Sequence, residues 1–408
     1  MVLMNCLKSL YYAVLKTVNL LTAKGEKSIF IVPHHNCRTD KYDIINYRSD
    51  NALCLFNYLI RQRKFNEYRI ALVVDDEHRI EEYLTYVRSI NKCIIIDFIP
   101  RKKYSYIYIK CFCRSKYIFS TTEFELFPYR IKKQCVSCLS YFTPFKNDFI
   151  YTEKKFANMA KRNNKTYDFY FTTSPLSSRI ISSDSGLYYS RFRSLGFPRN
   201  DTFYQNSNNC KFIECIKKEF YSFSKIITYT PTFRDYESKC NYEKRGLFGF
   251  DDKNIPSLIE VLKKHNAVLI AKLHPFQNKD VIDRLNCPNI KLYNSMQNNY
   301  SLYDLLSLTD LLITDYTSTV FDFLHTNKPV VFYFYDKQEY EQSRGFAFDP
   351  IEFVCPGQIT YDVKNLSTVI DYILCGNDDF KEKRYEVSKL MNYYQDGNSA
   401  RRISDFLF

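Results

Sequence analysis

A run of hydroxyl and carboxyl side chains in the second half of the chain stands where a short apolar segment gives way to helical spacing. Residues 310–323 read DLLITDYTSTVFDF. The first residues of this run predict a buried strand, and the spacing of Val320, Phe321 and Leu324 predicts a helix. The turn at 315–318 therefore offers hydroxyls and N–H groups at a helix N-terminus, which favours an anion such as phosphate. Taken alone, the same pattern is typical of ordinary helix capping.

Polar side chains also follow other apolar runs in the same half of the chain. YTPTFRD and AKLHP stand at the ends of apolar strands, and KPVVFYFYD contains such a strand. All three motifs carry hydroxyl, basic or acidic residues, and an Arg-Gly pair follows the last of them. Ligands of open α/β sheets bind beyond the carboxyl ends of the strands, so we expect these side chains at one edge. Arginine suits bidentate contact with a diphosphate. The side chains concerned are Thr230, Thr232, Arg234, Asp235, Lys272, His274, Asp336 and Arg344.

Glycine is too scarce for the usual phosphate-binding loops. Loops that wrap phosphate with backbone N–H groups need residues without a Cβ, and the chain has only nine glycines. Neither the G-x-G-x-x-G dinucleotide fingerprint nor the G-x-x-x-x-G-K-[ST] P-loop occurs. The G-x-S-x-G elbow and the H-E-x-x-H zinc helix are missing as well. A nucleotide bound to this chain must therefore be held by side chains and helix ends.

Apolar runs and amphipathic stretches alternate along both halves of the chain, which is typical of a parallel, doubly wound α/β sheet. The alternation restarts after an Asn-rich stretch at 200–209. We therefore predict two Rossmann-like domains facing a cleft, at 1–199 and 200–390, and a helix at 391–408 that packs back on the first. The expected strands are 28–33, 69–74, 93–98, 116–120, 167–171, 225–230, 267–273, 311–314 and 329–335. The expected helices are 51–63, 78–88, 256–264, 318–325 and 301–308, the last opened by the capping pair Ser301 and Asp304.

The formal charge of +13 favours polyanionic surroundings: nucleic acid, an anionic membrane surface or a phosphate-rich polymer. The basic residues are dispersed and no nucleic-acid-binding motif is recognisable, so we expect no nucleic-acid partner. No apolar run reaches the roughly 20 residues of a membrane span, and no signal-peptide pattern is present, which predicts a cytoplasmic protein. Residues 7–23 have helical apolar spacing with two lysines. Such a helix is expected to pack against the protein's own body, and the alternative is peripheral contact with the inner face of the cell membrane.

The 14 cysteines are spread through a long chain without a signal, which favours reduced thiols. Cys111, Cys113, Cys135 and Cys138 form two closely spaced pairs of the kind that bind zinc. Both pairs stand among strand-like apolar residues, without glycine-rich knuckles. We therefore expect no metal site, and no cofactor.

The polar motifs together resemble a known family. YTPTFRD, KLHP, DLLITDYTSTVFDF and KPVVFYFYDKQEYEQSRGFAFD, in this order and spacing, are similar to the characteristic blocks of CDP-glycerol glycerophosphotransferases, enzymes of teichoic acid and capsule synthesis. GFPRND at 196–201 resembles that family's block at the interdomain crossover. The resemblance is strong over about 130–395 of this sequence.

The resemblance implies a GT-B-like fold whose C-terminal domain holds the cytidine and diphosphate of a CDP-polyol donor. The acceptor would be an anionic polyol phosphate or a glycolipid. No metal would be needed, because His274, Arg344 and the helix end would carry the charge that accumulates on the leaving CMP. Thr314 and Tyr316 would shape the turn, and Asp322 would lie behind it. The donor-binding set would be Thr230, Thr232, Arg234, Asp235, Lys272, Thr314, Asp315, Tyr316, Thr317, Ser318, Asp322 and Asp336.

The acceptor side departs from the family's pattern. The family has a His-Gly pair followed by a lysine, and this His is thought to deprotonate the acceptor hydroxyl, whereas here Tyr141 and Phe142 stand before Lys146. A tyrosine hydroxyl ordinarily titrates near pH ~10, so it is a poor base at neutral pH. Three outcomes stay open: another base, a different acceptor that relies on positioning, or reduced activity. The candidate catalytic groups on this side are Tyr141, His34, His35, Glu123 and Glu125.

Transfer of a polyol phosphate from a CDP-activated donor to a cell-surface polymer or lipid-linked acceptor, with release of CMP, is the leading interpretation. A GT-B glycosyltransferase that uses a nucleotide sugar needs the same kind of site but yields a glycoside. A basic nucleic-acid-binding protein is the non-enzymatic alternative, and it would show salt-sensitive binding to random oligonucleotides.

Overall fold

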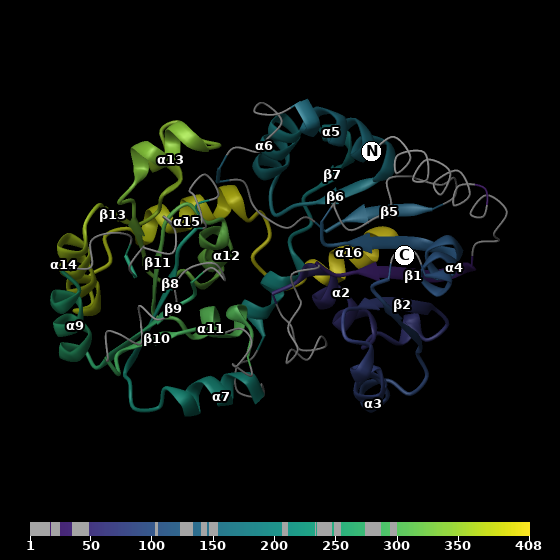
Figure 1. Cartoon of the computed structure of the whole chain (residues 1–408), viewed down its shortest axis with the longest axis horizontal. Coiled ribbons are helices and arrows are strands. Elements are labelled where there is room, and N and C mark those ends of the chain that lie inside the picture. Colours follow the sequence, from purple (N-terminus) through teal and green to yellow (C-terminus); the bar gives the residue numbers. More distant parts are fainter. Residues whose placement is uncertain are drawn as a thin grey trace. The chain divides into compact units, whose positions relative to one another are not determined.

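The computed structural model of the chain consists of two compact units (Figure 1). Unit 1 comprises Met1–Tyr141, Phe149–Asp201 and Asp396–Phe408, and unit 2 comprises Phe142–Asp148 and Thr202–Gln395. Each unit therefore contains a piece of chain that is remote in sequence from the rest of it. The structure describes residues 17, 25–34, 49–102, 105–122, 134–139, 145–146, 154–205, 211–232, 234, 247–248, 254–273, 287–293 and 300–408.

Unit 1 is built on a seven-stranded sheet in the order β3-β2-β1-β4-β5-β6-β7, and all neighbouring strands are parallel. Its strands are β1 (Gly25–Val32), β2 (Arg69–Val74), β3 (Ile95–Pro100), β4 (Ser115–Ser120), β5 (Cys135–Cys138), β6 (Phe169–Phe171) and β7 (Phe192–Arg193). Its helices are α2 (Asn51–Leu59), α3 (Ile80–Ile90), α4 (Tyr106–Arg114), α5 (Lys154–Thr166), α6 (Pro175–Ser185) and α16 (Ser399–Leu407).

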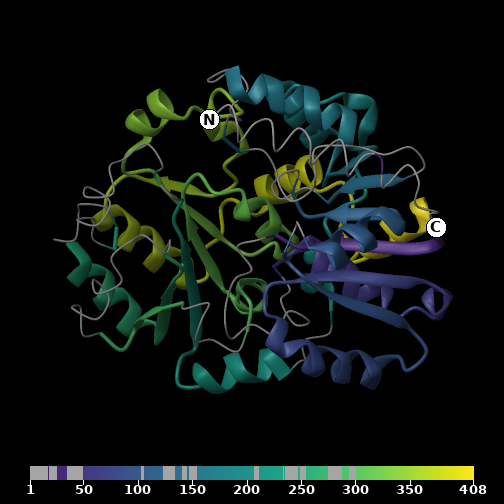
Figure 2. The same cartoon turned by 45° about the vertical axis from the view of Figure 1, so that its right-hand side comes forward.

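The central strand β1 is apolar on both faces, as a doubly covered parallel strand must be. Successive side chains of a strand point to opposite faces. Ile29 and Ile31 accordingly belong to one buried cluster, with residues of α2, α3 and α16, whereas Phe30 and Val32 belong to another, with residues of α4 and α6. Figure 2 shows the yellow C-terminal helix beside the purple strand β1.

Unit 2 is built on a six-stranded parallel sheet in the order β10-β9-β8-β11-β12-β13. Its strands are β8 (Lys225–Thr230), β9 (Ala267–Ala271), β10 (Ile290–Leu292), β11 (Leu311–Thr314), β12 (Val330–Tyr333) and β13 (Gln358–Thr360). Its helices are α7 (Lys211–Glu219), α9 (Ile255–Lys264), α11 (Leu302–Leu308), α12 (Thr319–Phe323), α13 (Lys337–Ser343), α14 (Val363–Leu374) and α15 (Lys381–Met391).

Helices cover both faces of the sheet in unit 2. Apolar residues of α9 and α14 pack on one face, and those of α7 and α11 pack on the other (Figure 1). The chain winds outward from β8 to β10 in one direction and from β11 to β13 in the opposite direction. The strand order thus reverses between β8 and β11, and this kind of switch point is where open α/β sheets bind ligands. The prediction of an α/β chain with two doubly wound sheets is confirmed.

Element boundaries differ from the predictions mainly at helix ends and in the shortest strands. The helix expected at 51–63 ends at Leu59, and a separate 3-10 turn (Arg63–Phe65) follows. The helix expected at 318–325 is the short α12 followed by a 3-10 turn (Leu324–Thr326), which Asn327 ends with a φ of 52°. The helix expected at 391–408 is confined to Ser399–Leu407. The capping box of Ser301 and Asp304 is present as predicted.

The described helices include none with both the length and the apolar character that a bilayer span requires.

The start of α16 is held by a buried carboxylate of unit 1. Asp201 accepts hydrogen bonds from the backbone nitrogens of Ser399 and Ala400, at 2.8 and 2.9 Å. Since the first N–H groups of a helix have no intrahelical acceptor, Asp201 satisfies donors that would otherwise be buried without a partner.

Replacing Asp201 with Ala is therefore expected to lower the free energy of unfolding by about 1–3 kcal/mol, because buried N–H groups lose their acceptor. Urea unfolding measures the change. Asp405→Ala removes an exposed carboxylate of α16 that pairs with Lys64, and this control should leave the midpoint unchanged. Equal midpoints for both variants would contradict the capping role of Asp201.

Candidate functional site

The switch point of unit 2 brings two predicted hydroxyl residues together. Thr230 ends β8 and Thr314 ends β11, and the two residues are paired in the sheet register. Their Oγ1 atoms are 3.2 Å apart, and Thr314 Oγ1 also donates to the Thr230 carbonyl at 3.1 Å. The carboxyl ends of β8 and β11 are thereby linked where the sheet edge is expected to bind a ligand.

Lys272 follows β9, next to this edge, and its backbone nitrogen donates to the Tyr229 carbonyl of β8 at 2.8 Å. Its side chain is half-buried, and desolvation lowers the pKa of its ammonium group. No described carboxylate offsets that desolvation through an ion pair or hydrogen bond. A partly desolvated cation of this kind gains most from an anionic ligand.

Arg234, predicted to contact the donor, lies at the centre of a buried ion-pair network. Its side chain is 1% exposed. Its Nη1 donates to Asp315 Oδ2 at 2.8 Å, and its Nε and Nη2 donate to the two oxygens of Asp336 at 2.6 and 2.9 Å. Burial opposes the charge on Arg234, but Asp315 foremost, and Asp336 with it, hold the pKa of the guanidinium well above its usual value. We call Arg234, Asp315 and Asp336 the buried triad.

Neighbouring groups donate hydrogen bonds to the remaining carboxylate oxygen of the triad, and aromatic rings surround the guanidinium of Arg234. Asp315 Oδ1 accepts from the nitrogen and the hydroxyl of Thr232, at 2.8 and 2.6 Å, and from the Tyr316 nitrogen at 2.6 Å. The rings of Tyr316, Tyr335 and Tyr340 lie 5.0, 5.3 and 5.2 Å from the guanidinium carbon, within cation–π range. The triad is thus bound on all sides by protein groups.

Tyr316 connects the triad to an aromatic stack. Its hydroxyl donates to Asp336 Oδ1 at 3.1 Å, and its ring stacks on Tyr340 and Phe334 at centroid distances of 4.1 and 4.9 Å. Burial, and then the charges of Asp336 and Asp315, raise the pKa of this phenol far above its usual value. Tyr316 is therefore a neutral donor to the triad at physiological pH.

The turn before α12 is not capped in the ordinary way. Ser318 stands at the N-cap position but forms no side-chain cap hydrogen bond. Thr317 Oγ1 is 3.2 Å from the Thr319 hydroxyl and accepts weakly from the Thr319 nitrogen, at 3.4 Å. Both Thr317 and Ser318 are half-buried. Asp322, on α12, is buried and accepts a hydrogen bond from the Tyr303 hydroxyl.

Arg344 is half-buried at the end of α13, where its backbone nitrogen donates to the Tyr340 carbonyl at 2.8 Å. Gly345 follows with a φ of 72°, which favours glycine, and turns the chain. The next residue, Phe346, packs its ring on Tyr316 at 5.3 Å and on Tyr340 at 5.6 Å. The Arg344 loop is in this way joined to the aromatic stack over the triad.

The structure thus brings Thr230, Thr232, Arg234, Lys272, Asp315, Tyr316, Asp336 and the Arg344 loop to neighbouring positions of one sheet edge. His34 lies in unit 1, half-buried, and its backbone nitrogen donates to Asp50 Oδ2 at 3.0 Å. The other predicted groups, His35, Glu123, Glu125, Tyr141, Asp235 and His274, lie outside the described residues. The sequence analysis did not predict the stacked rings of Phe334, Tyr340 and Phe346, although all three stand in the block KPVVFYFYDKQEYEQSRGF. The high Tyr and Phe content of the whole chain hid that signal.

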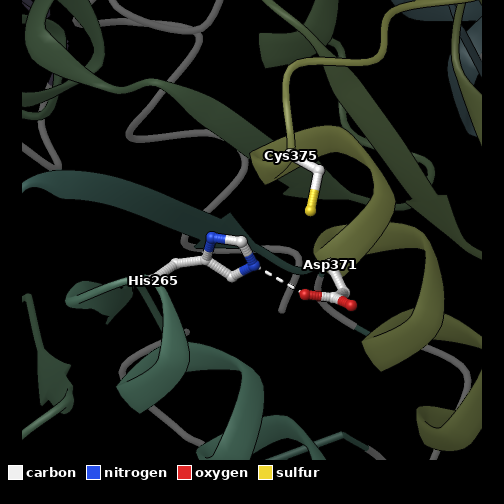
Figure 3. A group of neighbouring side chains, drawn as sticks. All are labelled: His265, Asp371 and Cys375. Atoms are coloured by element: carbon white, nitrogen blue, oxygen red, sulfur yellow. Dashed lines mark hydrogen bonds and ion pairs between the residues drawn. The ribbon is translucent and has the colours of Figure 1, made fainter.

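A separate group of His, Asp and Cys side chains lies between α9 and α14 (Figure 3). Donor atoms of His265, Asp371 and Cys375 lie within 4.8 Å of one another, a set that suits zinc. However, His265 Nε2 is 2.6 Å from Asp371 Oδ1, and Lys264 Nζ donates to both oxygens of Asp371 at 2.7 and 2.8 Å. Because Lys264 already neutralises this carboxylate, the group acts as an ion pair that ties α9 to α14.

Breaking the buried triad is expected to be costly. Arg234→Ala leaves two carboxylates buried without their cation, so the free energy of unfolding should fall by about 3–5 kcal/mol. Lys264→Ala breaks an exposed ion pair between two helices of the same unit, and it should change the free energy of unfolding little. Guanidinium unfolding of both variants measures the contrast, and an equal, small loss for both would refute the structural role of Arg234.

A known protein family matches most of the chain. The family model for CDP-Glycerol:Poly(glycerophosphate) glycerophosphotransferase matches residues 36–408. The teichoic acid glycerol-phosphate primase of Bacillus subtilis (strain 168) is 31% identical over 243 residues, which cover 59% of this chain and 58% of the primase. The teichoic acid ribitol-phosphate polymerase TarK of Staphylococcus aureus (strain NCTC 8325 / PS 47) is 27% identical over 256 residues, which cover 60% of this chain and 46% of TarK. The matched region thus spans about half the length of these relatives.

Solved structures show the same fold. The wall teichoic acid polymerase TagF, as its H548A variant, has a TM-score of 0.74 at 20% sequence identity, over 98% of this chain and 91% of that chain. UDP-GlcNAc 2-epimerase from Neisseria meningitidis, bound to UDP-GlcNAc, has a TM-score of 0.52 at 16% identity, over 93% of this chain and 98% of that chain. The predicted GT-B-like α/β fold class is confirmed. With the family model matching nearly the whole length, the chain belongs to the CDP-glycerol:poly(glycerophosphate) glycerophosphotransferase family.

Proposed function

We propose that this chain transfers a polyol phosphate from a CDP-activated donor to an acceptor hydroxyl and releases CMP. The observation that carries the proposal is the partly desolvated ammonium of Lys272, which meets no described anion at the sheet edge where open α/β sheets bind ligands. A diphosphate would supply the missing negative charge. Thr317 and Ser318 offer further hydroxyl donors on the turn before α12.

The reaction forms one phosphorus–oxygen bond and breaks another. The acceptor oxygen attacks the distal phosphorus of the CDP-polyol, and the bond from that phosphorus to the bridging oxygen breaks. The electron pair of the broken bond leaves with CMP, while the acceptor proton passes to a base. Negative charge grows on the departing CMP, so donors already in place at the diphosphate lower the barrier most. Lys272, Arg344 and His274 are the groups proposed to stabilise this charge.

The other predicted residues take positioning or acceptor-side roles in the proposal. Thr230, Thr232, Thr314, Asp315, Tyr316, Asp322, Asp336, Arg234 and Asp235 form or support the edge on which the donor rests. On the acceptor side, Tyr141 and His35 are proposed catalytic groups, and His34, Glu123 and Glu125 are the other candidates for the base.

The acceptor is proposed to be an anionic polyol phosphate or a glycolipid at the inner face of the cell membrane. The net charge of +13 supports an anionic partner, since a positive surface attracts and retains such a polymer. A cytoplasmic enzyme in peripheral contact with the membrane fits this partner. The relatives include both a glycerol-phosphate primase and a ribitol-phosphate polymerase, so either polyol is consistent with the donor.

A donor panel tests the reaction. Purified protein is incubated with CDP-glycerol, CDP-ribitol or a UDP-sugar, together with a polyol-phosphate acceptor, and nucleotide release is followed by chromatography. We expect CMP and a new phosphodiester, identified by mass spectrometry, and we expect His274→Ala to abolish both. UMP release with a glycoside would favour a glycosyltransferase, and no turnover with either CDP-polyol would overturn the proposal.

Lys272→Met separates donor binding from stability. The substitution removes a desolvated charge and keeps a side chain of similar length, so the melting temperature should stay equal or rise. The Kd for CDP-glycerol should rise by about tenfold or more, because hydrogen bonds to charged groups contribute about 1.5–3 kcal/mol. Calorimetric titration and a thermal scan measure the two quantities. A lower melting temperature with unchanged Kd would contradict the assignment.

The same lysine gives the donor affinity a pH dependence of definite sign. Desolvation lowers the pKa of free Lys272, and a bound diphosphate would raise it again. The affinity should therefore be greatest below the pKa of the free form and fall as the pH rises through it, and Lys272→Met should lose this decline.

A further inference from the structure

A short piece of the chain between β5 and α5 belongs to unit 2, although β5 and α5 themselves belong to unit 1. Phe145 and Lys146 are the described residues of this piece, Phe142–Asp148. Phe145 is 1% exposed. Its ring centroid is 5.2 Å from that of Phe321 in α12 and 6.4 Å from that of Phe332 in β12, and the second pair is nearly coplanar at 9°. Phe145 is thus a core residue of the donor-side unit.

The backbone of the same piece is bonded to the loop that carries Arg344. The Phe145 carbonyl accepts a hydrogen bond from the Ala347 nitrogen at 3.1 Å, and Lys146 and Phe346 form an antiparallel bridge. The bridge lies directly after Arg344 and Gly345 in the sequence. Two residues from an unrelated part of the chain therefore hold one side of this loop.

The other side of the loop is fixed by α13 and the aromatic stack. The nitrogens of Arg344 and Gly345 both donate to the Tyr340 carbonyl, at 2.8 and 3.2 Å. The Phe346 ring packs on Tyr316, which is bonded to the buried triad. With its start held by α13 and its end held by Phe145, the loop has a defined path, and the direction of the Arg344 side chain depends on both.

We propose that Phe145 is a positioning residue for donor binding: its buried ring anchors the bridge to Phe346 and Ala347 and thereby sets Arg344 for the diphosphate. The inference rests on the proposed function for the role of Arg344. It adds a residue from the sequence region of the acceptor side to the machinery that binds the donor. A guanidinium held in one orientation loses less entropy when it forms bidentate contacts, so the anchor strengthens binding without touching the ligand.

The variants to compare are Phe145→Ala, Phe145→Leu, Arg344→Ala and the double variant Phe145→Ala/Arg344→Ala, with Phe220→Ala as matched control. Phe220 is an equally buried aromatic residue of unit 2, 3% exposed, but it packs with Ile216, Val268 and Tyr293 in a different cluster. The control therefore creates a comparable cavity in the same unit without touching the loop. Phe145→Leu retains most of the buried volume and tests whether an apolar anchor suffices.

The measured quantities are the Kd for CDP-glycerol by calorimetric titration and the hydrogen-exchange rate of the Ala347 amide without ligand. We expect Phe145→Ala to raise the Kd about tenfold and to speed exchange at Ala347, and Phe145→Leu to restore most of both. Phe220→Ala should lower the melting temperature but leave both quantities unchanged. The double variant should bind no more weakly than Arg344→Ala alone, because residues that act through one another are non-additive.

Additive losses in the double variant, or a Kd for Phe145→Ala equal to that of the control, would overturn the inference. Unchanged exchange at Ala347 in Phe145→Ala would overturn it as well, and this outcome does not depend on the donor. Failure of the wild-type protein to bind CDP-glycerol would overturn the proposed function, and the role of Phe145 in donor binding with it. Wild-type binding that Phe145→Ala leaves intact overturns only the positioning role.

Discussion

Unit 2 depends on one buried charge. Arg234 follows β8, Asp315 follows β11 and Asp336 follows β12, and the ion pairs between them join the ends of these strands at the edge where a ligand is expected. Taking one cation and two carboxylates out of water is expensive, and the arrangement is tolerable because their hydrogen-bonding capacity is largely met by Thr232, Tyr316 and one another. Because these ion pairs and hydrogen bonds must all form at once, the ends of β8, β11 and β12 can vary little in position.

The triad also explains how a glycine-poor chain can build an anion site. Phosphate-binding loops usually rely on glycine so that the backbone can approach the ligand. Among the described residues of this edge, Asp315 and Asp336 are paired with Arg234. The described groups that remain for a ligand are cationic or neutral: the ammonium of Lys272 and the hydroxyls of Thr317 and Ser318. Neutralising the carboxylates inside the protein removes the repulsion that they would otherwise exert on a diphosphate.

The fold by itself does not choose the chemistry. A UDP-GlcNAc 2-epimerase and a teichoic acid polymerase both match this chain over more than nine-tenths of its length, so the choice depends on the family and on the residues at the edge. In the proposed function, the acceptor side is where we expect this member to differ from its family, with Tyr141 and Phe142 in the place of the usual His-Gly pair. The proposal is therefore that the donor is the one usual in the family, whereas the acceptor is activated in a different way.

The sequence by itself determined the class of fold, the strand ends that carry polar residues and the family. Alternating apolar and amphipathic segments dictate a parallel sheet, and in such a sheet the carboxyl ends of the strands meet at one edge, so Thr230, Lys272 and Thr314 could be assigned to neighbouring positions. Strands of two or three residues, such as β7, β10 and β13, have too little periodicity to be recognised. Only the tertiary structure decided which polar residues bind each other and which are left for a ligand. Arg234 lies 81 positions from Asp315 and 102 from Asp336, and Phe145 packs on Phe321 and Phe332, which are remote from it in sequence. Such pairings arise from packing in three dimensions, which local pattern does not encode.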